Sequence, residues 1–427
     1  MNLALASENN LSATRTLETS GLLSSILRHP LLMPYNRLIL LVVALNSFLF
    51  FKAEFLTVEI ILNFILINFT IANVIRSQYV VNTLFKVATS APTSWPLNVR
   101  WALGKVYHFG GLHVGAYFSG ACWLLFYFLG LMTNQYAASV FLISLVGVQL
   151  VVLLAVIVAA LPQIRSKYHN QFELTARFGN WLLLLTFWAQ TFYLEPTLFS
   201  TKTILLILIT GITIVPWLRL KKITINYTKP SNHVVLADFN YGVTPFAGSS
   251  TDLSLNPLFE WHSFANVPIP NRDGFKLTIS RAGDWTGRLI DQRPQHIWVK
   301  GIPTAGVGNI EKLFKKVVWV ATGSGIGPCL PHLFSEKVPA NLIWSTKNPE
   351  RTYGSELLQD ILKVQPEAVI WDTDQFGKPD LVQLALAAMQ ESGAEAVICI
   401  ANKKVTWNVV YEMERRGIPA FGAIWDS

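Results

Sequence analysis

The hydrophobic pattern of the chain changes near residue 222. Before that point six long apolar stretches follow one another, at Leu38–Phe51, Phe55–Ile75, Val106–Leu131, Ala137–Leu161, Trp181–Leu194 and Thr203–Leu218. A helix needs about 20 apolar residues to cross a bilayer. We extend the first stretch back to Leu31 and the fifth back to Phe172 to reach that length. The pattern predicts a six-helix transmembrane bundle, and buried helices of a soluble protein are the weaker alternative.

The second part of the chain has shorter apolar segments. Alternating segments punctuated by Pro, Gly and Asn lie at Ile223–Tyr227, Val234–Phe239, Phe275–Ser280 and Ile297–Val299. They predict a small antiparallel β domain. From Lys315 onward, apolar strands alternate with helical patterns. The strands are Lys316–Thr322, Ala340–Ser345, Ala368–Thr373 and Ala396–Ala401, and the helices include Ser355–Lys363 and Leu381–Glu391. Such alternation favours an α/β domain with a parallel sheet.

We therefore expect four parts. Residues 1–30 form a polar N-terminal segment, 31–222 the transmembrane domain, 223–305 the antiparallel β domain and 315–427 the α/β domain. Only 14% of the residues are charged and 52% are hydrophobic, which excludes both a single soluble globule and a disordered chain. The first 30 residues hold no apolar stretch that would make a cleavable signal peptide.

The charge distribution fixes the expected topology. Fifteen basic and 6 acidic residues precede Ile223, whereas 19 basic and 20 acidic residues follow it. Positive connections alternate with nearly neutral ones between the apolar stretches, which places both termini and the second part of the chain in the cytoplasm. The basic excess lies in the apolar part, so we expect a lipid bilayer and no nucleic acid as a partner. Three cysteines fit a reducing compartment and are too few for a zinc cage.

The strongest motif follows the first strand of the α/β domain. It runs from a buried strand through a turn with three glycines into a helical pattern, and comprises Thr322, Gly323, Ser324, Gly325, Ile326, Gly327 and Pro328. Glycines let a ligand approach the backbone, and a helix start offers N–H groups to a pyrophosphate. A plain structural turn is the alternative. Its place after the first parallel strand favours nucleotide binding.

Two further motifs lie in the β domain. One is a strand with His262, Ser263, Phe264 and Ala265, and the other is a tight turn into a helix with Gly283, Asp284, Trp285, Thr286 and Gly287. The turn is a second candidate anion site. Taken alone, the aromatic strand is more typical of a β-domain core than of a cofactor pocket.

The order of these three motifs resembles the ferredoxin reductase superfamily, and within it the ferric reductase and NADPH oxidase branch. That resemblance implies a FAD-binding β-barrel, a NAD(P)-binding α/β domain and six membrane helices. It also implies an NAD(P)H:acceptor oxidoreductase that passes a hydride from NADPH, with NADH possible, to FAD. The acceptor is unknown. The stretch Lys105–His113 and the ending Phe421–Ser427 are most similar to the haem-less, TmpA-type membrane flavoproteins.

The resemblance also implies roles for individual residues. His262 and Phe264 would flank the flavin, and Thr286 with the N–H groups from Gly283 to Gly287 would hold the FAD pyrophosphate. Thr322 to Pro328 would cradle the nicotinamide nucleotide. Lys347 and Lys378 are candidates for the 2′-phosphate of NADPH, with solvated lysines as the alternative. Trp425 would cover the flavin, and Cys399 would lie near the nicotinamide unless it is a buried structural thiol.

The sequence departs from the branch in two places. Ser263 and Ala265 stand where the branch has proline and a hydroxyl residue, so a hydroxyl that bonds the flavin ring is missing at Ala265. His108 and His113 are the histidines of the third apolar stretch, and the fifth has none. A bis-histidyl haem needs ligands on facing helices, so we expect no haem and no metal. Two alternatives to an oxidoreductase without haem stay open. One is a non-catalytic flavin- or nucleotide-binding membrane sensor, and the other is a haem-containing transmembrane reductase.

Overall fold

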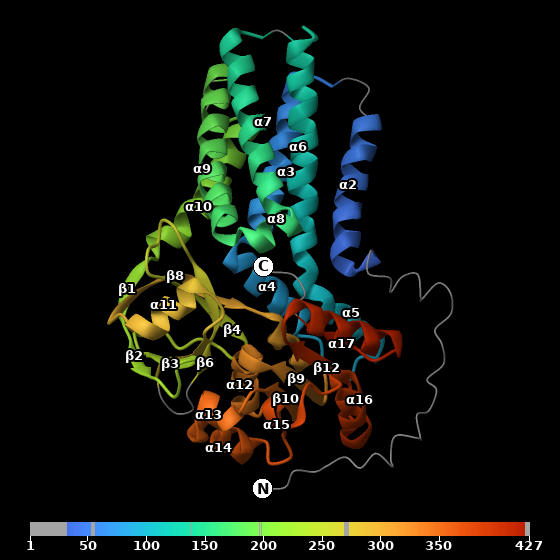
Figure 1. The fold of residues 1–427 in the computed structure, drawn as a ribbon. Helices are drawn as coiled ribbons and strands as arrows, with labels where there is room; N and C mark the ends of the chain where they lie inside the picture. The colour runs from blue at the N-terminus through green and yellow to red at the C-terminus, as the bar shows by residue number, and fades with distance from the viewer. Residues whose placement is uncertain are drawn as a thin grey trace.

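The structure is a computed structural model, and it describes residues 32–52, 56–136, 138–195, 197, 199–268 and 273–422. A helical bundle stands above two smaller sheet-containing parts (Figure 1). Its long helices are α2 (Pro34–Lys52), α3 (Val58–Arg76), α6 (Gly110–Met132), α7 (Val140–Ala160), α9 (His169–Leu194) and α10 (Thr201–Leu218). The predicted order of apolar helices, antiparallel sheets and parallel sheet is confirmed.

The helices of the bundle begin where the sequence supplies a cap. The hydroxyls of Thr57, Ser139 and Ser200 accept the N–H of the third residue beyond them, at the starts of α3, α7 and α10. Such caps satisfy N–H groups that lack an intrahelical partner. Inside the bundle, residues of α3, α6, α7, α9 and α10 form one buried apolar cluster, among them Ile65, Leu124, Val146, Phe187 and Leu206.

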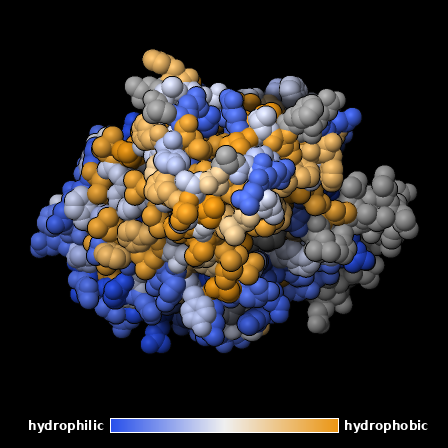
Figure 2. All heavy atoms as spheres, turned by 90° about the horizontal axis from the view of Figure 1, so that it is seen from above, coloured by the Kyte–Doolittle hydropathy of each residue, from blue (hydrophilic) through white to orange (hydrophobic). Residues whose placement is uncertain are grey.

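Of the helices that the structure describes, five are long and apolar enough to cross a membrane. They are Pro34–Lys52, Val58–Arg76, Leu97–Met132, Val140–Ala160 and Thr201–Leu218. Viewed along the bundle, hydrophobic residues gather over its centre and hydrophilic ones surround them (Figure 2). α9 is helical over 26 residues and packs against α7, but it is not among the five. A six-span bundle therefore stays a prediction.

The β domain consists of two four-stranded antiparallel sheets around one core. The strands are β1 (Lys221–Thr224), β2 (Asn226–Thr228), β3 (Val234–Phe239), β4 (Ser249–Ser254), β5 (His262–Ala265), β6 (Val267–Pro268), β7 (Phe275–Ser280) and β8 (His296–Ala305). Their orders are β1-β8-β4-β5 and β2-β3-β7-β6. Apolar side chains from both sheets, such as Val235, Leu253, Leu277 and Val299, meet in the core with α11 (Asp284–Gln292).

A five-stranded sheet forms the centre of the α/β domain, with every neighbouring pair parallel. Its order is β11-β10-β9-β12-β13, with β9 (Val317–Thr322), β10 (Ala340–Thr346), β11 (Val369–Asp372), β12 (Ala396–Ile400) and β13 (Ala420–Phe421). β13 was not predicted. The helices are α12 (Ile326–Ser335), α13 (Pro349–Tyr353), α14 (Ser355–Val364), α15 (Thr373–Phe376), α16 (Leu381–Ser392) and α17 (Lys403–Arg415). Separate apolar clusters cover the two faces of the sheet.

The connection between α3 and α6 joins the bundle to both sheet domains. It folds into α4 (Gln78–Ala88), α5 (Leu97–Gly104) and the 3₁₀ helix η3 (Lys105–Phe109), where the charge pattern predicted only a basic loop. The amide side chain of Gln78 bonds the backbone of Ile302 in β8. The guanidinium of Arg100, almost fully buried, forms two bonds of 2.6 and 3.1 Å to Glu395 beside β12. Lys105 pairs with Glu414 of α17.

Candidate functional site

The aromatic strand and the Gly-Asp-Trp-Thr turn of the β domain lie against each other. The ring of Trp285, in α11, is centred 4.2 Å from the ring of His262 and 5.7 Å from that of Phe264, both in β5. The indole N–H of Trp285 donates to Glu260 at 2.8 Å, and Arg288 donates to the same carboxylate at 3.2 Å. Glu260 thus fastens the strand to the helix.

Three of the four residues of β5 are half-buried. His262 and Phe264 are half-buried, and Phe264 packs against the core of the β domain. Ser263 is exposed and Ala265 is half-buried. Burial, with smaller contributions from His169 and Arg288, lowers the pKa of His262 to about 4. The imidazole is therefore neutral near pH 7, and it can lie against a neutral aromatic ring without a buried charge.

The start of α11 is a candidate anion site. The hydroxyl of Thr286 accepts the N–H groups of Ala282 and Gly283 at 2.9 and 3.1 Å, which fixes the turn. The N–H groups of the following first turn have no intrahelical partners. A Cβ atom built at Gly283 would have no neighbouring atom within 4 Å, so this end of the helix is open. It borders a depression of about 530 Å³ lined by Arg281, Ala282, Gly283, Asp284, Gly287, Arg288 and Asp291.

This donor set suits a diphosphate. It combines the positive end of a helix with the guanidinium groups of Arg281 and Arg288, and the carboxylates of Asp284 and Asp291 in the same lining offset part of that charge. Arg281 also pairs with Asp291 through two bonds of 2.5 and 3.1 Å, which hold the guanidinium at the rim. A diphosphate such as that of FAD is an anion that a helix start can bind, and α11 also contacts the rings of His262 and Phe264 through Trp285.

The glycine-rich turn of the α/β domain is held from several sides. Gly323 to Gly325 form the 3₁₀ turn η5 between β9 and α12, and Gly323 has φ +50°. The indole N–H of Trp344 donates to the carbonyl oxygen of Gly323 at 3.0 Å. A Cβ atom at Gly325 would lie 2.0 Å from the carbonyl oxygen of Ile400, at the end of β12. Only glycine fits that approach, because the neighbouring atom is backbone.

The structure brings this turn to the edge of the β domain. A Cβ atom at Gly327 would lie 3.7 Å from atoms of Thr278 in β7, an ordinary contact. α12 contacts β5, β6 and β7, and η5 contacts β7. Thr322, Ser324, Ile326 and Pro328 belong to the same strand–turn–helix unit. The motifs of the β domain and the glycine-rich turn are therefore neighbours through the packing of α12 on β5 and β7.

Two predicted lysines lie in connections that follow β10 and β11. Lys347 follows β10 and Lys378 follows α15, and both side chains are exposed. The loops that carry them are tied together, because the buried carboxylate of Asp372 accepts the N–H of Asn348 and of Asp374, each at 2.9 Å. The exposed ammonium groups are available to an anion, and their role toward a 2′-phosphate stays a prediction.

The other predicted site residues are Cys399 and Trp425, and His113 is a histidine of the bundle. Cys399, in β12, is fully buried in the apolar cluster with Val397 and Val410. Burial raises the pKa of its thiol to about 12, so the thiol stays protonated. Its role near a nicotinamide stays a prediction. Trp425 lies outside the described residues. In the bundle, Nδ1 of His113 lies 2.8 Å from the carbonyl oxygen of Ala72.

Two residues that shape the site were not predicted from the sequence. Glu260 directly precedes the aromatic strand, but its bonds to Trp285 and Arg288 join residues 25 and 28 positions apart. Trp344 was seen only as a strand residue, although it holds the glycine-rich turn. An acidic residue beside an otherwise aromatic strand was the one available signal for Glu260.

Comparison with known proteins gives two kinds of similarity. The family model "Adenylate-forming reductase 03009, C-terminal domain" matches residues 307–427. Adenylate-forming reductase 03009 of Coprinopsis cinerea is 41% identical over 429 residues, which cover 96% of this chain and 42% of that protein. Adenylate-forming reductase 06235 of the same fungus is 39% identical over 428 residues, with the same coverage. The chain thus spans less than half the length of these curated relatives.

Among solved structures, a ferredoxin NADP⁺ reductase from Neisseria gonorrhoeae with bound FAD and NADP aligns with a TM-score of 0.39 and 16% identity. The alignment covers 48% of this chain and 98% of that one. The relatives are named reductases, and this chain combines five apolar helices with antiparallel sheets and a five-stranded parallel sheet.

Proposed function

We propose that the chain is a membrane-bound, NAD(P)H-dependent flavin oxidoreductase. Residues 223–305 would bind FAD and residues 315–427 the nicotinamide nucleotide. The observation that carries the proposal is the packing of the glycine-rich turn and α12 against β5 and β7. This contact brings the proposed nucleotide site of one domain to the proposed flavin site of the other. The names of the two fungal relatives support a reductase.

The side chains and backbone of this chain would bind and orient FAD and the nicotinamide nucleotide. The open start of α11, with Arg281 and Arg288 at its rim, would hold the FAD pyrophosphate. The neutral His262 ring and Phe264 would form one wall of the flavin pocket. Ser324, exposed in the glycine-rich turn, would lie beside the nucleotide phosphates. FAD, when bound, supplies the hydride-accepting chemistry, so no side-chain acid, base or nucleophile is needed.

The proposed membrane topology determines where the two sheet domains would lie. Six spans with both termini cytoplasmic would place the flavin and nucleotide domains in the cytoplasm, where NAD(P)H is available. The α3–α6 connection, with Arg100 and Gln78, would keep these domains fixed to the bundle. We propose a cytoplasmic or membrane-soluble electron acceptor, and no haem.

A charge placed in the glycine-rich turn tests the proposal. Ser324→Glu puts a carboxylate beside the proposed phosphates, while the fold should tolerate it because Ser324 is exposed. The new carboxylate should repel each nearby phosphate group by about 1 kcal/mol or more. We therefore expect the KM for NADPH to rise at least about 10-fold. The assay is anaerobic reduction of FAD in the full chain, followed by flavin absorbance.

Ser355→Glu is the matched control. Ser355 is exposed and also stands at the start of a helix, α14, on the same domain. Its KM should stay at the wild-type value. Equal KM values for the two variants would remove the turn from the nucleotide site. A protein that binds FAD but is reduced by neither NADPH nor NADH would support the sensor alternative, and a Soret absorption band would support the haem alternative.

A further inference from the structure

The pairing of strands β4 and β8 is interrupted in the β domain. Along β4, Ser250 pairs with Thr304 and Asp252 with Lys300, so a single residue of β4 faces three residues of β8. The extra residues of β8 form a bulge that includes Gly301, which has φ +70°. Bulges of this kind detach a strand locally and are common beside functional sites.

α4 holds the detached segment. Gln78 accepts the N–H of Ile302 at 3.1 Å and donates to its carbonyl oxygen at 3.0 Å. Asn82 accepts the N–H of Ala305 at 2.7 Å and donates to the carbonyl oxygen of Pro303 at 3.0 Å. These side-chain amides replace the missing bonds to β4. The bulge is therefore a fixed feature, and a cavity lies under it.

The cavity measures about 390 Å³ and has a basic lining. Its walls include Arg219, Lys221 and Lys300, and none of its lining residues is acidic. Arg219 lies with its guanidinium 5.4 Å from the ring centre of Tyr79, and the ammonium of Lys300 lies 4.4 Å from that of Trp261. Asp252 opposes Lys300 across the strands and offsets part of its charge. Arg219 and Lys221 therefore supply most of the net positive charge.

Thr251, the β4 residue that faces the bulge, lines the cavity with an unused hydroxyl. The residue is 4% exposed, and its Oγ1 has no hydrogen-bond partner among the described residues. A buried hydroxyl without a partner costs about 1–3 kcal/mol. One water fills only about 30 Å³, far less than the cavity. A donor hydroxyl and several cations around one space suit a phosphate group.

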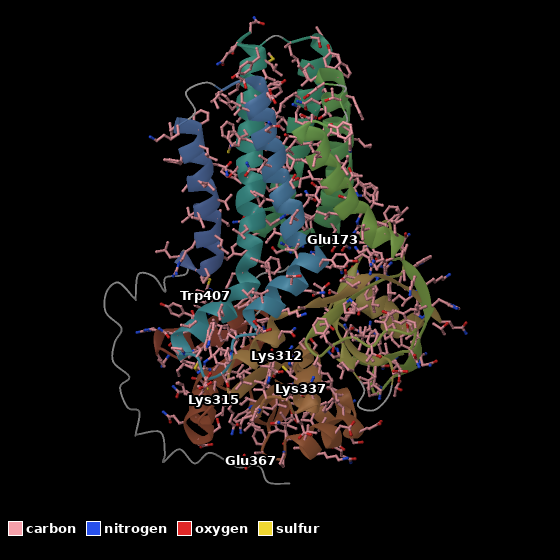
Figure 3. The ribbon with its side chains drawn as sticks, turned by 180° about the vertical axis from the view of Figure 1, so that it is seen from behind. Glu173, Lys312, Lys315, Lys337, Glu367 and Trp407 are labelled. Atoms are coloured by element: carbon pink, nitrogen blue, oxygen red, sulfur yellow. The ribbon has the colours of Figure 1, made fainter. Side chains whose placement is uncertain are left out.

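The cavity lies at the foot of the last bundle helix. Leu218, the final residue of α10, forms part of its wall and is 78% exposed. α10 runs directly into the β domain (Figure 1). Glu173, in the lower part of α9, is labelled at the same junction of bundle and β domain in Figure 3. A basic pocket at this level is placed to meet lipid headgroups.

We propose that the cavity under the β8 bulge binds the phosphate of an anionic phospholipid. Thr251, Lys221 and Arg219 would hold the phosphate, and Leu218 would lie toward the acyl chains. The proposal concerns a site separate from the flavin and nucleotide motifs, and it does not rest on the proposed function. Free phosphate shares the same chemistry and is the second possible source.

Lipid titration of the full chain in detergent tests the proposal. The probes are phosphatidic acid, phosphatidylcholine and inorganic phosphate, and the readout is the rise in melting temperature with probe concentration. We expect saturable stabilisation by phosphatidic acid, with an apparent Kd that rises about 10-fold in Thr251→Val and several-fold in Lys221→Gln. Phosphatidylcholine should have little effect, since its headgroup carries no net charge.

Matched controls separate the cavity from general surface charge. Lys276→Gln removes a charge on β7, and Thr224→Val removes an exposed hydroxyl on β1, both in the same domain but outside the cavity lining. Both should bind phosphatidic acid like the wild type. Inorganic phosphate that competes with the lipid supports the phosphate site with a soluble source. Equal stabilisation by both lipids, or equal losses in Lys221→Gln and Lys276→Gln, overturns the proposal, and Lys221→Gln decides even if Thr251→Val fails to fold.

Discussion

Alanine at each glycine of the β9–α12 turn should give different results, although the sequence presents the three as one motif. At Gly325 the new Cβ would lie 2.0 Å from the carbonyl oxygen of Ile400. A normal contact between carbon and oxygen is about 3.3 Å or longer. The turn and the end of β12 must therefore separate by more than about 1 Å. Strain of that kind costs about 3 kcal/mol.

Alanine at Gly327 or Gly323 should change the stability less than alanine at Gly325. At Gly327 the new Cβ meets Thr278 at 3.7 Å within a helix, so alanine should be neutral or stabilise by up to about 1 kcal/mol. At Gly323, with φ +50°, alanine should cost about 1–2 kcal/mol. For a domain pair of this size, about 3 kcal/mol corresponds to a fall of roughly 6–12 °C in melting temperature.

Thermal unfolding of the full chain in detergent, followed by tryptophan fluorescence, measures these differences. Gly325→Ala should melt lowest of the three and lose NADPH-dependent flavin reduction. Gly327→Ala should melt at or above the wild-type temperature. The reasoning is refuted if Gly325→Ala melts within about 2 °C of the wild type, or if Gly327→Ala is the more damaging change.

Three further predictions follow from other contacts. Arg100→Met should destabilise the chain by about 3 kcal/mol, because it leaves the half-buried carboxylate of Glu395 and the carbonyl oxygen of Leu313 without their donor. Glu395→Gln should cost less, because the amide oxygen can still accept from Arg100, and calorimetry distinguishes the two variants. Because the pKa of His262 in the folded chain is about 4, below its ordinary 6.5, its contribution to stability is complete above pH 6.5 and is lost as the pH falls through 4; His262→Gln should flatten this acid limb in a series of melting curves. The double change Lys347→Gln and Lys378→Gln should raise the KM for NADPH about 10-fold and leave that for NADH unchanged, and equal effects on both nucleotides would contradict a 2′-phosphate role.

The parts of the fold that repeat an apolar period were predictable from the sequence. β3 and β7 have the predicted bounds, Val234–Phe239 and Phe275–Ser280, because their alternate residues fill the core. β4 (Ser249–Ser254) was missed. Four of its six residues are Ser or Thr, and only its pairing with β5 and β8 makes it a strand. Tertiary pairing of this kind has no local signal.

The joints between the domains could not be predicted for a similar reason. Gln78 and Ile302 are 224 positions apart, and Arg100 and Glu395 are 295 apart. The charge of Arg100 entered the sequence only as part of the basic connections that predict topology, which stays a prediction, and its buried bonds depend on the final packing. The motifs of the candidate site were visible because glycine and aromatic residues cluster locally. Their meeting through α12 and β7 was only implied by the resemblance.

Anaerobic reduction by NADPH tests the central claim most directly. The full chain is purified in detergent, supplied with FAD, and its absorption spectrum is recorded before and after NADPH is added without air. The account predicts a bound flavin spectrum that bleaches on addition of the nucleotide. Failure to retain FAD, or a bound flavin that neither NADPH nor NADH bleaches, would contradict it.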